Sequence, residues 1–306
     1  MAWKGVHLTR PARLSVKSRQ LFVNQDDGDT FVALEDIAWI VADNHQTTLS
    51  VALLSACAEA GIAIITSNSR HIPSALTLPF HSHHRTAAVA QLQVAAKGPL
   101  RKRLWQAITR AKIQNQEAVL HRLERKKPPP LSQMAAKVRS GDPDNVEARA
   151  ARDYWPCLFE GFVRNDENDL RNKALNYAYA VLRGCVARAL VAVGLIPAIG
   201  LHHGSQTNAF NLADDLIEPF RPLADLIVFR LLQDSDPETD LSRDMRQVLA
   251  AIPMCDVEVS GEVLSILHGC EVVAQSLVRV LECGDVSKFQ LPTLPSAQVE
   301  MQGLVP

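Results

Sequence analysis

The sequence predicts an α+β protein in which a small β-rich N-terminal domain precedes a larger, all-α C-terminal domain. Short β-favouring runs separated by turn formers fill the first ~70 positions. From Arg85 onward, apolar residues recur at helical spacing. With 306 residues, 47% of them hydrophobic, the chain is long enough for about two domains with buried cores. We expect the β-rich domain over residues 1–74, the helical domain over 75–285 and an extended tail over 286–306.

The N-terminal elements are predicted from turn formers and side-chain periodicity. Gly28 in Gln25–Asp29 favours a hairpin turn, because glycine adopts positive φ at little steric cost. Thr48–Ala60 has apolar residues at spacings of three and four and ends at Gly61, which predicts a helix. His71–Pro79 is the expected hinge. The expected β runs lie around Leu14 and Val16 and over residues 21–23, 31–34, 37–41 and 62–65.

The second part of the chain is expected to form a helical bundle with short connections. The residues after Gly284 include three prolines and lack helical periodicity, which predicts the extended tail. The expected helices are Thr86–Ala96, Leu100–Leu123, Leu131–Ser140, Val146–Trp155, Arg171–Val193, Asn211–Leu232, Arg243–Ala251 and Gly261–Leu281.

Charge is unevenly distributed within a net charge of -1. Residues 97–139 hold twelve Lys and Arg against two acids, whereas residues 214–244 hold nine acids against three Arg. A basic region beside an acidic one suits a protein that grips a polyanion and binds a cation, although charged helix faces are often only solvated.

Several classes of protein have no support in the sequence. The six cysteines form no CxxC pair, which argues against a zinc ribbon or a disulfide scaffold and favours a reducing compartment. The uncharged run Ala189–Leu201 is too short to span a bilayer, and the N-terminus lacks the apolar stretch of a secretory signal, so we expect a cytoplasmic protein without membrane contact. No phosphate-binding glycine loop or serine-hydrolase motif occurs. His81, His83 and His84 cluster in the expected linker without neighbouring acids, which disfavours a metal site there.

Two constellations are candidates for chemistry. Asp142 and Pro143 favour a helix start, which places Glu147 in the first turn, where an acid also favours the helix dipole. The pair His202 and His203 precedes a helix on which Asn211, Asp215 and Glu218 share one face. Acids on a core-forming helix need compensation, either by a divalent cation or by a salt bridge, for example with Arg221. An imidazole with several carboxylates suits Mg²⁺ or Mn²⁺ better than structural zinc.

These runs resemble one family closely. GDPDNVEARAARDYW, NKALNYAYAVLRG and GLIPAIGLHHGSQTNAFNLADDLIEPFRPL, together with the β-rich start, resemble the CRISPR-associated spacer-acquisition integrase, the universal first-named Cas endonuclease. The likeness is greatest to the branch that travels with the single-protein, RNA-guided effector nuclease. It covers about the first 285 residues and leaves out the tail.

The resemblance implies a catalytic helical domain with one divalent metal, Mg²⁺ or Mn²⁺, held by Glu147, His203 and Glu218. Asp215 matches an additional family acid that completes the site or holds water, and His202 is expected to pack. The implied activity joins the 3′-hydroxyl ends of short DNA fragments to a CRISPR repeat by transesterification, with DNA endonuclease activity besides. The alternatives are a nuclease without physiological integration and a non-catalytic DNA-binding scaffold.

The implied partners are double-stranded DNA, a second copy of the chain joined through the β-rich domain, and the small ferredoxin-like second Cas protein. The RNA-guided effector nuclease is a further candidate partner. Candidate DNA contacts are drawn from the basic region and the acidic helix, and Tyr154 either positions DNA or packs in the core. The basic candidates are Lys102, Arg103, Arg125, Lys126, Lys127 and Arg221.

Overall fold

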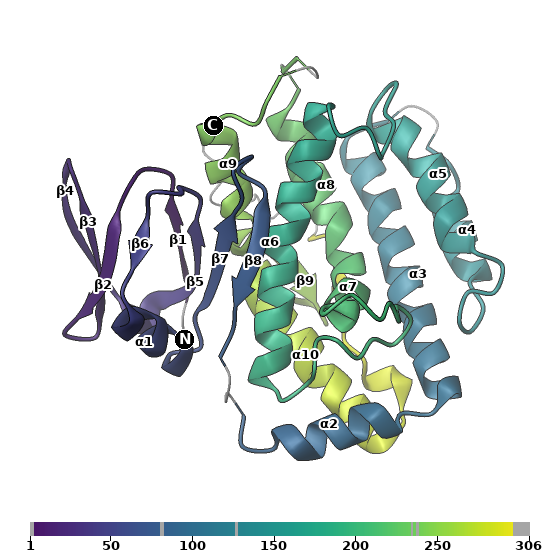
Figure 1. The fold of residues 1–306 in the computed structure, drawn as a ribbon. Coiled ribbons are helices and arrows are strands. Elements are labelled where there is room, and N and C mark those ends of the chain that lie inside the picture. Colours follow the sequence, from purple (N-terminus) through teal and green to yellow (C-terminus); the bar gives the residue numbers. More distant parts are fainter. Residues whose placement is uncertain (1–2, 80–82, 126–127, 234, 237–238, 296–306) are drawn as a thin grey trace.

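The computed structural model describes residues 3–79, 83–125, 128–233, 235–236 and 239–295. Its N-terminal strands form two four-stranded sheets, in the orders β1-β5-β7-β8 and β4-β3-β2-β6 (Figure 1). The predicted hairpin is confirmed, because Gln25 pairs with Gly28 and Gly28 has φ 141°. The elements are β1 (Lys4–Leu8), β2 (Arg13–Lys17), β3 (Gln20–Gln25), β4 (Gly28–Ala33), β5 (Ile37–Ala42), β6 (Thr48–Leu49), α1 (Val51–Glu59), β7 (Ala63–Ser67) and β8 (Pro73–Thr77).

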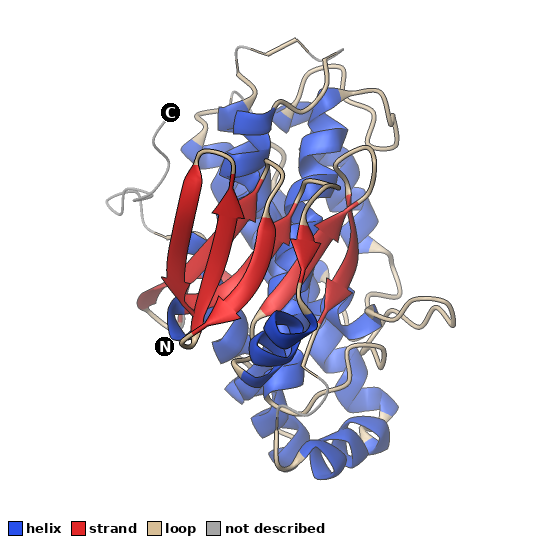
Figure 2. Ribbon diagram, turned by 60° about the vertical axis from the view of Figure 1, so that its left-hand side comes forward, coloured by secondary structure: helices blue, strands red, loops and turns tan. Residues whose placement is uncertain are grey.

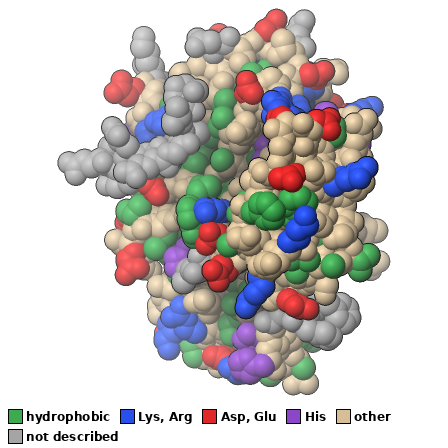
Figure 3. All heavy atoms as spheres, turned by 90° about the vertical axis from the view of Figure 1, so that its left-hand side faces the viewer, with side chains coloured by type: hydrophobic (Ala, Val, Ile, Leu, Met, Phe, Trp, Pro, Cys, Tyr) green, Lys and Arg blue, Asp and Glu red, His purple; other side chains and the backbone are tan. Residues whose placement is uncertain are grey.

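The first sheet is covered on both faces, so every residue of its central strand β5 is buried. Ile37 and Ile40 face a cluster shared with the second sheet and α1. Trp39 and Val41 face the helical core instead. From Trp39 to Val41 the side chains alternate with the period of two expected of a strand between two apolar layers, and the register shift against β1 between Ile37 and Trp39 lets Ile37 face the same cluster as Ile40. Figure 2 shows the N-terminal strands lying in front of the long helices, and Figure 3 shows acidic, basic and hydrophobic side chains interspersed on the outer side of the strands.

The helices confirm most of the predicted ones, with α6 in contact with both the first sheet and the helices around it (Figure 1). Among the described residues, no helix is long and apolar enough to cross a membrane. The helices are α2 (Thr86–Ala95), α3 (Gly98–Arg122), α4 (Leu131–Lys137), α5 (Val146–Leu158), α6 (Leu170–Ala192), α7 (Asn211–Ile217), α8 (Arg221–Leu231), α9 (Arg243–Ala250) and α10 (Ile266–Cys283).

The prediction that the C-terminal part is all α is wrong. Strands β9 (Asp256–Val259), β10 (Glu262–Ser265) and β11 (Pro292–Thr293) form a three-stranded sheet in the order β10-β9-β11. Ser260 and Gly261 join β9 to β10 with φ of 56° and 84°, the two positive values that a tight hairpin turn requires. The expected helix from Gly261 therefore begins only at Ile266, after this hairpin.

Two further expectations change in detail. The boundary expected at residue 74 and the hinge expected at His71–Pro79 fall on β8, which pairs antiparallel with β7. The tail that we expected to be extended from residue 286 starts with a 3-10 turn, η4 (Val286–Lys288), and continues into β11; residues 296–306 lie outside the described part.

The helix expected over Asn211–Leu232 is interrupted by a 3-10 turn, η2 (Glu218–Phe220). Pro219 and Pro222 have no backbone N–H, so two of the hydrogen bonds of a continuous helix cannot form there. Arg221 N–H bonds to the Glu218 carbonyl instead, which closes the tighter turn. Glu218 thus lies at the break between α7 and α8.

Candidate active site

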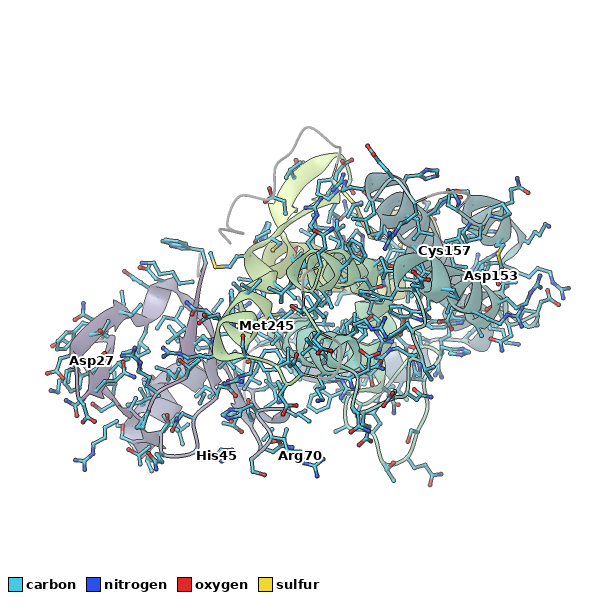
Figure 4. The ribbon with its side chains drawn as sticks, turned by 90° about the horizontal axis from the view of Figure 1, so that it is seen from above. Asp27, His45, Arg70, Asp153, Cys157 and Met245 are labelled. Carbon is cyan, nitrogen blue, oxygen red and sulfur yellow. The ribbon has the colours of Figure 1, made fainter. Side chains whose placement is uncertain are left out.

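Glu147 lies in the first turn of α5. The carboxylate of Asp142 accepts hydrogen bonds from the N–H groups of Val146, at 2.9 Å, and Glu147, at 3.0 Å. The helix begins at Val146, because Asn145 takes a left-handed conformation with φ 50°. Pro143 is therefore outside the helix, contrary to the prediction, although Asp142 still satisfies the N–H groups at its start. Seen from above, α5 and the N-terminal strands lie at opposite ends of the molecule, as Asp153 and Asp27 show (Figure 4).

Glu218 is held on the inner side of the helix break, where its side chain is 5% exposed. One oxygen forms an ion pair of 3.0 Å with Arg221 Nη1. The other, Oε2, lies 2.5 Å from Lys112 Nζ but in no hydrogen-bond geometry. Burial alone would raise the pKa of Glu218, but the charges of Lys112 and Arg221 lower it, so this buried carboxyl is ionised.

Lys112 on α3 joins the two glutamates, because its ammonium also forms an ion pair with Glu147. Its side chain is only 9% exposed. Burial would lower the pKa of Lys112, but the carboxylates of Glu218 and Glu147 raise it, so a positive charge is retained where the two acids converge.

His203 is positioned by Asp215, which is fully buried. One carboxylate oxygen accepts from His203 Nδ1 at 2.7 Å and from the His203 N–H at 3.1 Å. The other accepts from the N–H groups of Leu201, at 2.5 Å, and His202, at 3.1 Å. The hydrogen bond with Asp215 raises the pKa of His203. Asp215 thus orients the imidazole and leaves Nε2 as the ring nitrogen that faces away from this carboxylate.

The loop before α7 is held by α3 and by close packing at a glycine. Arg101 donates to the carbonyls of Gly200, at 2.7 Å, and Leu201, at 3.2 Å. A Cβ at Gly200 would lie 2.2 Å from the His203 carbonyl oxygen, so this position requires glycine. His202 stacks on Trp105 with ring centroids 4.1 Å apart, which agrees with the packing role expected for it.

The predicted convergence of Glu147, His203 and Glu218 is seen only in part. The two glutamates meet at Lys112, where each forms an ion pair. His203 interacts with Glu218 electrostatically, because the charge of Glu218 contributes to the raised pKa of the imidazole. Within the described ranges, no group of three His, Cys, Asp or Glu side chains is close enough together to hold a metal ion. In chemistry the donors fit Mg²⁺ or Mn²⁺, since two carboxylates and an imidazole are ligands of the kind that these ions accept. The arrangement of the side chains is a separate matter: Lys112 Nζ forms ion pairs with both glutamates and has to move away from them before one metal ion can bind both.

The predicted DNA contacts divide into three groups. Lys102 and Arg103 are exposed on α3. Arg125 and Arg221 have partners within the protein: Arg125 donates to the Leu158 carbonyl at 2.5 Å and its guanidinium lies 4.4 Å from the Phe229 ring centroid, while Arg221 pairs with Glu218. Lys126 and Lys127 lie outside the described residues.

Tyr154 is fully buried, and its hydroxyl donates to Asp225 at 3.0 Å. The hydroxyl of Tyr179 donates to the same carboxylate. Burial raises the pKa of Asp225 to about 6, although both tyrosine hydrogen bonds act to lower it. Of the two roles left open for Tyr154, the structure shows packing in a buried polar cluster.

Sequence reasoning missed the inward face of α3. Arg101, Trp105, Lys112 and Asn115 each touch a part of the site, yet only the charge of the two basic residues was noted. Their spacing of four, seven and three residues places them along one helical side. A lysine on the apolar side of a helix was the signal that could have identified Lys112, because a buried lysine needs a partner.

Comparison with solved structures gives the fold first. A solved structure of a casposase bound to its integration product has the same fold, with a TM-score of 0.77 at 17% identity, covering 100% of this chain and 96% of that one. A chain of a Cas6-RT-Cas1–Cas2 complex matches with a TM-score of 0.72 at 17% identity, covering 94% of this chain and 36% of that one.

Sequence comparison then gives the family. The family model described as CRISPR associated protein Cas1 matches residues 6–249. The CRISPR-associated endonuclease Cas1 of Neisseria meningitidis serogroup C (strain 8013) is 38% identical over 299 residues, covering 96% of this chain and 97% of that protein. The chain belongs to the Cas1 family, as the resemblance of its motifs predicted.

Proposed function

We propose that this protein is a metal-dependent DNA endonuclease and integrase of CRISPR adaptation. Membership of the Cas1 family supports the biological setting, and the similar Neisseria protein is named an endonuclease. The observation that carries the proposal is the meeting of Glu147 on α5 and Glu218 in the turn η2, far apart in the sequence, at one buried positive charge. A fold alone has little need to bury an acid and a lysine together beside a second, half-buried acid, since replacing such buried groups with apolar ones is often stabilising.

The proposed reaction is a transesterification at phosphorus. A 3′-hydroxyl of a short DNA fragment forms a new phosphodiester with the CRISPR repeat, and the repeat strand is released with a free 3′-hydroxyl, so one P–O bond replaces another and the proton passes from the attacking to the leaving oxygen. Hydrolysis follows when water takes the place of the attacking hydroxyl. Bond exchange of this kind needs no nucleotide cofactor, in keeping with the absence of a phosphate-binding loop from the sequence.

Mg²⁺ or Mn²⁺ bound by Glu147, His203 and Glu218 would offset the negative charge that builds on the phosphate. Asp215 holds the proton on Nδ1 of His203, so that Nε2 presents its lone pair. Asp215 is therefore proposed as a positioning residue and not as a direct ligand, since both of its oxygens already accept hydrogen bonds. Arg221 keeps Glu218 ionised within the protein interior.

The proposed partners follow the family. Double-stranded DNA would lie along the exposed basic residues Lys102 and Arg103, which contact backbone phosphates without reading sequence. A second copy of the chain, joined through the β-rich domain, and the small second Cas protein complete the proposed assembly, which the Cas1–Cas2 complex named above supports by its fold. The RNA-guided effector nuclease is a further proposed partner, and the proposed location is the cytoplasm.

A strand-joining assay with purified protein tests the function. Glu147→Gln, His203→Ala and Glu218→Gln are each expected to abolish joining of a 3′-hydroxyl DNA duplex to a CRISPR repeat, because each removes one donor to the cation. EDTA is expected to stop the wild-type reaction, and Mg²⁺ or Mn²⁺ to restore it. The matched control is Asp153→Asn, an acid on the same helix as Glu147 whose side chain is 42% exposed, which should retain activity.

The same assay separates the alternatives. Cleaved product without joined product would favour a nuclease, and DNA binding without turnover at any metal concentration would favour a scaffold. Full strand joining by one of the three variants would remove that residue from the site.

A further inference from the structure

The C-terminal segment 289–295, here called the C-terminal strap, is docked against the site from outside the helical bundle. Its strand β11 pairs with β9, with Pro292 opposite Val259 and Thr293 opposite Glu258. The N–H of Gln290 donates to Ser276 Oγ at 3.1 Å. Leu291 and Leu294 pack against the helical core. The strap also contacts both α3 and the turn η2 that carries Glu218.

Asn115 on α3 connects the strap to that turn. Its amide group donates to the carbonyl of Pro219, at 2.8 Å, and to the carbonyl of Pro292, at 2.9 Å. Its carbonyl oxygen accepts from the N–H of Leu294 at 3.2 Å. The side chain is 2% exposed, and both of its N–H donors and its oxygen are used. One buried amide therefore holds two segments that are more than seventy residues apart.

The turn at Glu218 depends on hydrogen bonds from other elements, such as those of Asn115. Pro219 and Pro222 remove two N–H groups from the break between α7 and α8, so the backbone there has fewer hydrogen bonds of its own. Pro219 directly follows Glu218, and its carbonyl is the group that Asn115 holds. A shift of this peptide moves the Glu218 carboxylate relative to Glu147.

We propose that the C-terminal strap and Asn115 form a positioning element for the active site, which fixes the Glu218 turn only while the strap is docked. The inference rests on the proposed catalytic role of Glu218. Asn115 acts through Pro219 and Glu218 and is a positioning residue. The strap thereby makes the last described part of the chain a requirement for an active site that includes Glu147 and Glu218.

Three proteins test this proposal against the wild type. One ends at Gln290 and lacks Pro292 and Leu294, and its matched control ends at Pro295 and keeps the whole strap. The third carries Asn115→Leu, which removes all three hydrogen bonds while keeping a neutral side chain of similar size. Leu53→Ala, a core change between the N-terminal sheets, serves as a control for loss of stability alone.

Hydrogen exchange followed by mass spectrometry gives the first readout. Peptides covering residues 214–224 are expected to exchange faster in the chain ending at Gln290 and in Asn115→Leu, and at the wild-type rate in the chain ending at Pro295. Strand-joining kinetics give the second: kcat is expected to fall about 10- to 100-fold with the KM for DNA unchanged, since misplacement by about 1 Å has effects of this size. Leu53→Ala should lose stability without this fall in kcat.

The outcomes are distinct from those for the proposed function. Unchanged exchange over residues 214–224 in both altered proteins overturns the positioning role, whatever the activity. Equal losses of kcat in Leu53→Ala and Asn115→Leu, at equal loss of stability, would also overturn it. A wild-type protein without strand-joining or nuclease activity contradicts the proposed function, and hydrogen exchange then decides the role of the strap.

Discussion

At the scale of single residues, the direction of a side chain decides what its charge does. Twelve basic residues between positions 97 and 139 look alike in the sequence, and all of them could grip DNA. In the structure, Lys112 turns inward to Glu147 and Glu218, whereas Lys102 stays in solvent. A buried charge of this kind is retained only because opposite charges surround it.

Replacing Lys112 with methionine is expected to destabilise the protein strongly. Lys112→Met leaves the buried carboxylate of Glu218 with Arg221 as its remaining cation, and removing one partner of a buried ion pair typically costs about 3–5 kcal/mol. Urea denaturation measures the free energy of unfolding. The double variant Lys112→Met/Glu218→Gln should recover a large part of the loss, because the unpaired charge is gone. If the losses in free energy of unfolding of Lys112→Met and Glu218→Gln add up to the loss of the double variant, the proposed coupling between the two charges is contradicted.

At the scale of elements, short breaks and loops position the site more than the long helices do. Most of the predicted range Asn211–Leu232 is helical, but two prolines divide it into two helices at Glu218. The loop of His203 has no regular structure, and the buried carboxylate of Asp215 holds it together. Periodicity identifies long helices well and says little about such connections, whose conformation depends on single hydrogen bonds.

Gly200→Ala tests how tightly the His203 loop is built. A Cβ at this position would lie 2.2 Å from the His203 carbonyl oxygen and 2.9 Å from Asp215 Oδ2, so the loop has to move. We expect a stability loss of about 1–3 kcal/mol by thermal denaturation, together with loss of strand joining. Gly204→Ala is the matched control in the same loop, because a Cβ there meets nothing within 4 Å. Equal behaviour of the two variants would show that the loop tolerates displacement.

At the scale of the whole molecule, the β-rich and helical parts share one core. Trp39 on the central strand donates from its indole to the Ala250 carbonyl at the end of α9, at 3.2 Å. Gly5 makes room for this ring, because a Cβ there would lie 2.2 Å from a ring carbon of Trp39. Asp43, which is fully buried after β5, accepts from Arg246 Nε of α9 at 2.6 Å. These contacts bind the first sheet directly to the helical part.

The pH dependence of stability is expected to reveal the Asp43 contact. Burial by itself would raise the pKa of Asp43, but the polar neighbours His7, Arg246 and Ser67, of which Arg246 donates a hydrogen bond to it, lower the pKa from 3.8 to about 2. A carboxyl whose pKa is lowered by folding stabilises the protein above its unfolded pKa and loses that effect as the pH falls through the folded value. The free energy of unfolding should therefore decrease between about pH 5 and pH 2 more steeply in the wild type than in Asp43→Asn. Parallel curves from urea denaturation at each pH would contradict this assignment.

The sequence by itself predicted most strands of the first domain, although not β1 or β8, the long helices and the family, and it singled out Glu147, His203, Asp215 and Glu218 as candidates, because these depend on local periodicity, turn residues and specific motifs. Only the tertiary structure decided that Lys112 joins the two glutamates, that Asp215 is engaged by the histidine loop, and that the C-terminal strap reaches the Glu218 turn through Asn115. It also decided that the C-terminal part includes a small sheet. The physical reason is that ion pairs, buried amide hydrogen bonds and strand pairing join residues distant along the chain, and whether a lysine faces solvent or a buried carboxylate depends on what packs against its helix.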